Sequence, residues 1–265
     1  MTLRKGYCDG PEGQIHWRMV KLDSSVELPD LYCFSPAPLS SMAYMNLLPA
    51  LGQHQRAIAP DYPGQAGSDG GSAQPSIESY AASMIAVIQK LSNGSPVNVL
   101  GFHSGCLVAA EVKRQAPTLV DKAILIDVPA FDADTRAKYL PMVGAPFQPS
   151  PDLASVAKAW DMAVTKRQDT QPLDQCLSLF ADIVGNGPRM NATFHAAFTY
   201  DVEARLAELG PGVAIIATKS SLLEPSRRAA DLIPNAQLVE LLDIERSVLD
   251  EHAEITAKAV QDLLV

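Results

Sequence analysis

Short apolar runs alternate with longer segments of helical periodicity along most of the chain. Six of these runs have the length and the aliphatic content of β-strands: residues 31–34, 56–60, 97–100, 123–127, 213–217 and 237–241. Several are apolar at successive positions, which is typical of parallel strands that helices cover on both faces. The alternation therefore predicts an α/β fold with an open, mostly parallel sheet flanked by helices.

Two helical segments show the spacing most clearly, and the first also carries signals at its ends. In the segment 76–91, apolar side chains recur at intervals of three and four residues, Ser76 is a suitable N-cap, and the Asn-Gly pair at 93–94 can end the helix. The segment 251–264 repeats this spacing. We expect His252 to lie in solvent at the start of that last helix.

The stretch 131–208 interrupts the alternation, because it carries aromatic residues at helical spacing and no convincing strand. We therefore predict an α/β core formed by residues 1–130 and 209–265, with a helical insertion at 131–208. Ligands of such sheets bind at the strand ends from which this insertion emerges, so we expect it to act as a lid. The alternative is a set of helices that only enlarges the core.

The composition is that of a globular protein. With 47% hydrophobic and 19% charged residues among 265, the chain can bury a sizeable core and has too little charge for disorder. Thirty acidic residues against 21 Lys and Arg give a formal charge of −9, which argues against nucleic-acid and anionic-membrane partners. The apolar runs are also too short to cross a bilayer.

The four cysteines, at positions 8, 33, 106 and 176, are widely spaced and form no Cys-x-x-Cys pair. This spacing argues against a disulfide framework or a zinc ribbon, and it suits a reducing compartment. Because the first residues lack the apolar run of a signal peptide, we expect a cytoplasmic protein. We find no phosphate loop, dinucleotide fingerprint or metal-ligand spacing, so we expect no metal and no cofactor. A small-molecule substrate or ligand is the expected partner, and the oligomeric state is open.

The turn after the strand at 97–100 carries the most specific chemical signal. Residues 101–105 read Gly-Phe-His-Ser-Gly, and an apolar helix comes directly after them. A Gly-x-nucleophile-x-Gly turn between a strand and a helix is a nucleophile elbow, which presents its central side chain at the helix N-terminus. The central residue in this chain is His103. Cys106, one turn position later, is expected to be a small residue that packs the helix.

Three other motifs extend this turn to a family resemblance. The segment 61–68 reads Asp-Tyr-Pro-Gly-Gln-Ala-Gly-Ser and resembles the Asp-x-Pro-Gly-x-Gly-x-Ser turn of the α/β-hydrolase superfamily, with Ala66 at a usual glycine position. Residues 34–38 stand at the place of the family's oxyanion turn, and 233–239 resembles the run into its last strand. The resemblance covers nearly the whole chain. It implies a mostly parallel α/β-hydrolase sheet with a helical lid inserted after the family's sixth strand, here at 123–127.

The resemblance also implies three catalytic positions, and none of them carries the usual side chain. The nucleophile position is His103 instead of serine, cysteine or aspartate. The acid position after the seventh strand falls on Ser220 or Ser221, and the position of the general-base histidine, counted back from Ala253, falls on Arg246. Arginine stays charged and cannot act as a base. We therefore do not expect an ordinary serine-hydrolase mechanism.

The surviving groups suggest a different chemistry. The helix dipole disfavours a protonated imidazole at the apex, so His103 is expected to be neutral near pH 7 and to act as a base or nucleophile. Arg246 would clamp a carboxylate or stabilise an enolate. The amides of Ser104 and Ala37, beside Ser35, would form an oxyanion hole. These roles predict an unconventional hydrolase, lyase, decarboxylase or isomerase that acts on a small carbonyl- or carboxylate-bearing molecule.

Alternative assignments exist for several of these residues. Ser104 could be a displaced nucleophile with His103 as its base, although adjacent residues at a helix start point about 100° apart. Asp127 or Asp132 could be a relocated acid, or each could be an ordinary turn or cap residue. Arg246 could pair at the surface, and the acids within its reach are Asp243, Glu245 and Asp250.

The insertion adds further candidates for substrate contact, namely Trp160, Asp161, His195 and Tyr200, for which packing inside the insertion is the alternative. A second functional class also remains open. In it the protein is a catalytically silent pseudohydrolase that binds a small ligand or a partner protein. His103 would then be a buried histidine in a site that has lost its chemistry.

Overall fold

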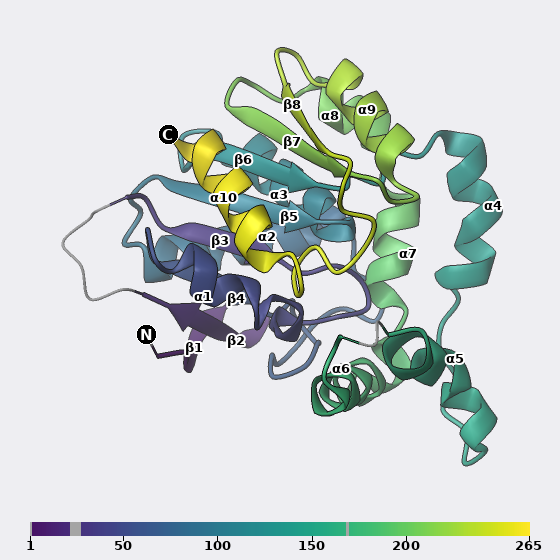
Figure 1. The fold of residues 1–265 in the computed structure, drawn as a ribbon. Coiled ribbons are helices and arrows are strands. Elements are labelled where there is room, and N and C mark those ends of the chain that lie inside the picture. Colours follow the sequence, from purple (N-terminus) through teal and green to yellow (C-terminus); the bar gives the residue numbers. More distant parts are fainter. Residues whose placement is uncertain (1, 22–27, 168–169) are drawn as a thin grey trace.

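The computed structural model describes residues 2–21, 28–167 and 170–265, so residues 1 and 22–27 of the predicted core and 168–169 of the predicted insertion lie outside it (Figure 1). Within these ranges eight strands form one sheet in the order β1-β2-β4-β3-β5-β6-β7-β8. Their bounds are β1 Arg4–Gly10, β2 Gly13–Val20, β3 Leu31–Phe34, β4 Ala57–Pro60, β5 Val97–Phe102, β6 Val120–Ile126, β7 Val213–Thr218 and β8 Gln237–Leu241. Strand β2 pairs antiparallel with both β1 and β4, and every other neighbouring pair is parallel. The predicted α/β class and mostly parallel sheet are confirmed.

All six predicted strands are present, but the sequence pattern missed the ribbon of β1 and β2. This ribbon lies at the edge of the sheet and buries few of its apolar side chains fully, among them Cys8, Ile15 and Val20. An antiparallel pair with one face toward solvent lacks the continuous apolar run of a parallel strand. The six-strand prediction was therefore incomplete at this edge.

Helices cover both faces of the sheet. On one face α2 (Ile77–Leu91), α3 (Ser104–Gln115) and α9 (Leu223–Leu232) pack into one hydrophobic cluster, and on the other α1 (Leu47–Leu51) and α10 (Ala253–Leu264) pack into a second. Figure 1 shows α1 and α10 on the near side of the strands and α2 and α3 behind them. No helix in the described ranges is long and apolar enough to cross a membrane.

The predicted helix ends are found in the structure. The Ser76 hydroxyl accepts a hydrogen bond from the Ser79 amide as the N-cap of α2. Asn93 and Gly94 have positive φ angles just beyond the end of α2 and turn the chain toward β5. His252 is the residue that precedes α10.

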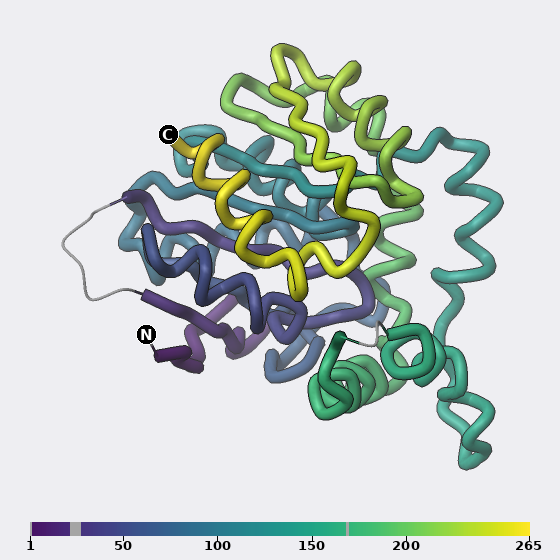
Figure 2. Tube along the Cα trace, in the orientation of Figure 1, coloured from purple at the N-terminus to yellow at the C-terminus, as the bar shows by residue number. Residues whose placement is uncertain are grey.

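Helices fill the described part of the chain between β6 and β7. We call α4 to α8 the inserted helices, with bounds α4 Ala133–Val143, α5 Ala157–Trp160, α6 Leu173–Gly185, α7 Ala192–Thr199 and α8 Val202–Ala207. Short 3₁₀ turns at Leu153–Val156 and Gly187–Arg189 and a π-helical turn at Asp161–Thr165 connect them. In Figures 1 and 2, α4, α5 and α6 stand out to one side of the sheet, whereas α7 lies nearer to it and packs against α2 and α3.

Polar contacts hold α6 to the core beside the strand ends. The amide and hydroxyl of Ser40 both donate to the Asp182 carboxylate, at 2.9 and 2.8 Å. The amide of Ala66, in the turn after β4, donates to Asn186 Oδ1 at 2.9 Å. The α/β-hydrolase-like turn at 61–68 is thus one of the surfaces against which the inserted helices pack.

Candidate active site

His103 lies at the sharp turn between β5 and α3, with φ 50° and ψ −122°. A positive φ is unfavourable for a residue with a side chain, and the surrounding structure must enforce it. The two flanking glycines are required by space. A Cβ on Gly101 would lie 2.3 Å from the Gly105 carbonyl oxygen, and one on Gly105 would lie 2.0 Å from the Phe34 carbonyl oxygen. The turn has the backbone of a nucleophile elbow, with an imidazole at its apex.

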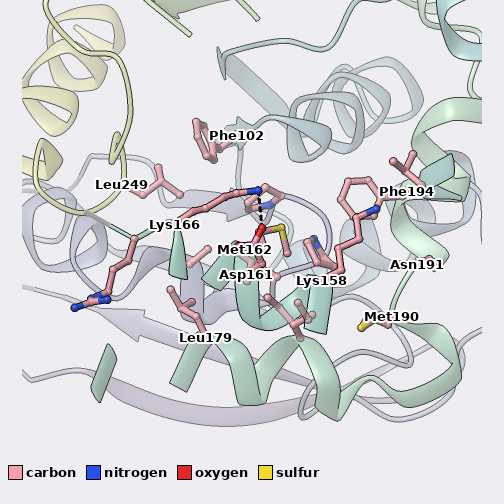
Figure 3. Close-up of a pocket in the computed structure, with 18 of the residues that line it drawn as sticks. Phe102, Lys158, Asp161, Met162, Lys166, Leu179, Met190, Asn191, Phe194 and Leu249 are labelled. Carbon is pink, nitrogen blue, oxygen red and sulfur yellow. Dashed lines mark ion pairs between the residues drawn. The ribbon is translucent and has the colours of Figure 1, made fainter. Parts of the chain in front are cut away.

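Three cavities in the described part of the molecule adjoin this turn. The central cavity, of about 530 Å³, is lined by His103, Asp127, Arg246 and their neighbours. The small cavity, of about 210 Å³, has His103 and Ser104 on its wall. The large cavity, of about 1140 Å³, lies between the core and the inserted helices, and it shares Phe102 and Arg246 with the central cavity. Figure 3 shows Phe102 on the wall of the large cavity.

The surroundings of His103 favour a neutral imidazole. Burial lowers the pKa of His103 below its ordinary 6.5, and the charge of Asp127 opposes this shift. The Phe102 ring lies against the imidazole, with 4.0 Å between ring centroids. Desolvation disfavours the charged form of a histidine, so the base form persists into mildly acidic solution.

Asp127 is the carboxylate that borders this site. It comes directly after β6, has no exposed surface, and lines the central cavity together with His103. Its carboxylate accepts hydrogen bonds from the amide and the hydroxyl of Thr218, at 2.8 and 2.7 Å. Asp132, the other acid considered, instead caps α4 by accepting from the Thr135 amide at 2.7 Å. Of these two acids, Asp127 is therefore the one placed to act on the imidazole.

The predicted oxyanion turn carries a contact that the sequence did not suggest. The Ala37 amide donates to Ser104 Oγ at 2.6 Å. One of the two amides expected to form the oxyanion hole is therefore already bonded to the serine hydroxyl. Ser104 is the first residue of α3, and its own amide is among those that a helix leaves without an intrahelical acceptor. Ser35 is buried and borders none of the three cavities, and its carbonyl accepts from the Tyr62 hydroxyl at 3.0 Å.

Arg246 borders both the large and the central cavity, as do its neighbours Ser247 and Val248. Arg246 is exposed, but the ion pair considered as an alternative for it is not found among the residues that the structure describes. Glu245 pairs instead with Lys219 at 2.9 Å, and none of the acids named for that pairing forms an ion pair with Arg246 in the described part of the chain. Ser220 and Ser221 line the central cavity opposite this loop, at the family's acid position.

Two aromatic candidates of the insertion lie away from His103. Trp160 is 43% exposed, borders none of the three cavities, and packs edge-on against Phe180 at 5.2 Å between ring centroids. Tyr200 is buried in the core, where its hydroxyl donates to Glu111 Oε2 at 2.8 Å. The expectation that these two residues contact substrate is not supported by their positions, because packing has drawn both side chains elsewhere.

The remaining candidates are divided. His195, on α7, borders none of the three cavities. Asp161 lines the large cavity and forms an ion pair with Lys166 at 2.5 Å, which is the dashed line in Figure 3. The Cys106 thiol is buried and donates to the carbonyls of Gly101 and Ile126, so it packs the helix as predicted.

Sequence reasoning missed the aromatic walls of the site. Phe102 lines both the large and the central cavity, and Phe131, Phe194 and Phe198 line the small cavity. Phe102 could have been found, since it is the variable residue just before the elbow apex. The others come from the inserted helices and from the loop before them, and no local pattern assigns them to the site. Among the described residues, no three His, Cys, Asp or Glu side chains are grouped as a metal site would require.

Comparison with known proteins agrees with this arrangement of sheet and elbow. The sequence profile of the family described as alpha/beta hydrolase fold matches residues 33–189, which is more than half of the chain. The chain belongs to this family. The resemblance inferred from the elbow and from the turn at 61–68 is thereby confirmed at the level of the family.

Individual relatives are distant. RutD from Agrobacterium fabrum (strain C58), which carries the provisional name of a carbamate hydrolase, is 27% identical over 235 residues, covering 83% of this chain and 86% of RutD. A hydrolase from Pseudomonas aeruginosa PA01 has a similar structure, with a TM-score of 0.80, 17% identity and 98% of each chain covered. The enol-lactonase from Burkholderia xenovorans LB400 has a TM-score of 0.77 at 16% identity, covering 98% of this chain and 99% of the lactonase. These two structural likenesses concern the fold.

Proposed function

We propose that this α/β-hydrolase-fold protein is a hydrolase-type enzyme that acts on a small carbonyl-bearing molecule, with the His103 imidazole as its base. The observation that carries the proposal is a partly buried imidazole with a lowered pKa at the strained apex of the elbow, on the wall of two cavities. Strained backbone and shifted pKa values concentrate at functional sites. The distant relative named as a carbamate hydrolase supports acyl chemistry.

In the proposed reaction, His103 takes a proton from a water molecule as the water oxygen attacks the substrate carbonyl. The negative charge that develops on the carbonyl oxygen is stabilised by the Ser104 amide and hydroxyl. This hydroxyl accepts from the Ala37 amide, so its own proton is free to point toward the substrate. When the tetrahedral intermediate collapses, the leaving group takes the proton from the imidazolium, and Asp127 stabilises that cation while it exists.

The same base can also act on a C–H bond next to a carbonyl. That reaction would make the protein a lyase, decarboxylase or isomerase, with Arg246 stabilising the enolate or a carboxylate. Product analysis in heavy-oxygen water separates the two outcomes, because only hydrolysis transfers the label into the product acid. We further propose that the insertion at 131–208 is a lid, because α4 to α7 supply much of the wall of the large cavity.

The test is a panel of aryl esters, lactones and carbamates with the wild type and His103→Ala. We expect the substitution to lower kcat/KM by about 10²- to 10⁴-fold, the usual contribution of a general base. His54→Ala removes an exposed histidine outside the cavities and should leave activity unchanged. Undiminished turnover in His103→Ala would contradict the proposal.

A catalytically silent ligand-binding protein is the second candidate. It is favoured by the bond from the Ala37 amide to the Ser104 hydroxyl, because that amide is then not available to a substrate oxygen. This candidate predicts that neither the wild type nor His103→Ala turns over any member of the panel, while both bind ligands equally well.

A further inference from the structure

The large cavity has a charge opposite to that of the chain. Among its described lining residues are four cationic side chains (Lys158, Lys166, Arg167 and Arg246) against two acids (Asp161 and Asp250), while the whole protein carries a formal charge of −9. A positive cavity in an acidic protein raises the local concentration of anions. The cavity is therefore built to favour an anionic group.

Most of these cations form no ion pair with a neighbouring side chain. Lys166 pairs with Asp161, but Lys158, Arg167 and Arg246 form no ion pair with any residue for which the structure gives a position. Asp250 is occupied by three side-chain amides, from Asn46, Gln171 and Gln175. Within the described residues, three of the four cations that line the cavity therefore form no ion pair, although Asp250 lines the same cavity and Glu245 lies within electrostatic reach of Arg246.

Arg167 is the most specific of the three cations. Its guanidinium donates through Nη1 to the Val164 carbonyl at 3.2 Å, and its Nε is buried without a partner among the described residues. Leaving a buried donor unsatisfied is costly. A planar guanidinium suits a carboxylate better than a single positive charge does.

The rest of the cavity wall suits an apolar chain. Met162 and Met190 lie on it with Leu179, Phe194 and Leu249 (Figure 3). Met142 and Met162 are 63% and 46% exposed at this wall, so they present apolar surface to the cavity and to solvent. Methionine side chains adapt to ligands of varied shape.

We propose that the large cavity binds an amphiphilic carboxylate, with its apolar chain on the methionine and aromatic wall and its carboxylate on Arg167 and Lys158. The ligand reaches the elbow where the large and central cavities meet, at Phe102 and Arg246. Binding itself does not depend on the proposed function. The inference rests on the proposed function only where it takes the bound ligand to be the substrate, which would then be a monoanion with an apolar body.

The test measures binding by titration calorimetry with octanoate and with octanamide, a neutral probe of the same length. We expect octanoate to bind the wild type about tenfold or more tightly than octanamide, as hydrogen bonds to a charged group require. Arg167→Gln and Lys158→Gln should each weaken octanoate binding by several-fold to about tenfold and leave octanamide unchanged. Lys158 is exposed, so its variant remains informative if Arg167→Gln disturbs the turn at Val164.

Lys138→Gln is the matched control, because Lys138 is an exposed cation of the inserted helices outside the large cavity. Equal affinity for the two probes, absence of saturable octanoate binding, or an equal loss in Lys138→Gln would overturn the inference. His103→Ala should bind octanoate like the wild type, because His103 does not line this cavity. In that variant, undiminished turnover would mean that the proposed function fails, whereas loss of octanoate binding would mean that this inference fails.

Discussion

At the scale of single residues, the imidazole of His103 is governed by two opposing influences, burial and the Asp127 carboxylate. A histidine whose folded pKa lies below 6.5 binds fewer protons in the folded than in the unfolded chain. Its contribution to stability is therefore present above pH 6.5 and is lost as the pH falls toward the lowered pKa. The base form needed for catalysis persists over the same range.

This argument predicts the pH dependence of activity. The acidic limb of kcat/KM should lie below pH 6.5, and Asp127→Asn should move it lower still, because the carboxylate charge raises the pKa of His103. Asp127→Asn should also cost about 1–3 kcal/mol of unfolding free energy, since Asn cannot accept both bonds from Thr218. A pH–rate profile and urea unfolding measure the two effects. An acidic limb that rises in Asp127→Asn would refute the assignment.

The Ser104 hydroxyl gives a second prediction at this scale. Ser104→Ala removes a donor to the developing oxyanion and at the same time frees the Ala37 amide to replace it. We expect a loss in kcat of about tenfold, smaller than the roughly 10²- to 10³-fold typical of a lost oxyanion donor. Steady-state kinetics with the best substrate of the panel decides this. Complete inactivation would instead make Ser104 the nucleophile.

At the scale of elements, the junction of β5 and α3 depends on close backbone contact. Gly105→Ala places a methyl group 2.0 Å from the Phe34 carbonyl oxygen, where the backbone of β3 cannot give way. We expect a loss of more than about 3 kcal/mol of stability or an insoluble protein. Gly210→Ala is the control, because a Cβ there meets nothing within 4 Å, and it should change stability by less than about 0.5 kcal/mol. Denaturant unfolding of both variants tests the contrast.

The contact between Asp182 of α6 and Ser40 of the core also makes the stability depend on pH, but in the direction opposite to that of His103. Burial raises the pKa of Asp182 above its ordinary 3.8, and the hydrogen bonds from Ser40 oppose that rise. The folded chain thus holds a proton that the unfolded chain has lost, so stability falls as the pH rises from 3.8 through the raised value. A neutral side chain at this position removes that dependence.

Two substitutions of Asp182 test this account. Asp182→Asn keeps one of the two bonds from Ser40 and removes the buried charge, so it should abolish this part of the pH dependence and cost less stability at neutral pH than Asp182→Ala. Asp182→Ala loses both bonds from Ser40, and we expect a cost of about 1–3 kcal/mol together with faster hydrogen exchange in α6. Unfolding measured at several pH values, with exchange by mass spectrometry, gives both results. Unchanged exchange in Asp182→Ala would show that apolar packing alone holds α6.

At the scale of the whole molecule, the parallel strands bring separate loops to one edge of the sheet. His103 comes after β5, Asp127 after β6, Ser220 and Ser221 after β7, and Arg246 after β8. These side chains are far apart in the chain and line one cavity. This is the general behaviour of open α/β sheets, in which ligands bind beyond the carboxyl ends of the strands.

The inserted helices divide into a part that belongs to the core and a part that does not. Val202 and Leu206 of α8 are buried in the main hydrophobic cluster and belong to the core. The segment 146–190 is different, because its two ends lie close together: Asn191 Nδ2 donates to the Ala145 carbonyl at 2.8 Å. A short Gly-Ser linker can therefore replace residues 146–190. We expect this shortened chain to fold but to lose octanoate binding, while deletion of all of 131–208 should prevent folding. Circular dichroism and calorimetry distinguish these outcomes.

How much the sequence could predict depends on the range of the interactions involved. Some features are local, because they depend only on residues close together in the chain: the strand runs, the cap at Ser76 and the glycines around His103. The ribbon of β1 and β2 was missed because its burial alternates. The sequence also could not show whether Asp127 or Asp132 is the acid beside His103, because both come after the same strand and only packing decides which one is buried.

The sequence by itself determined the α/β class, six of the eight strands, and the presence of an imidazole at the elbow, because backbone conformation and helix or strand periodicity are set by neighbouring residues. Tertiary structure alone decided that Ser104 bonds to Ala37, that Tyr200 turns into the core toward Glu111, and that three cations unpaired among the described residues share a cavity. Those contacts join residues far apart in sequence, and their energies depend on burial and distance, which exist only once the chain has folded.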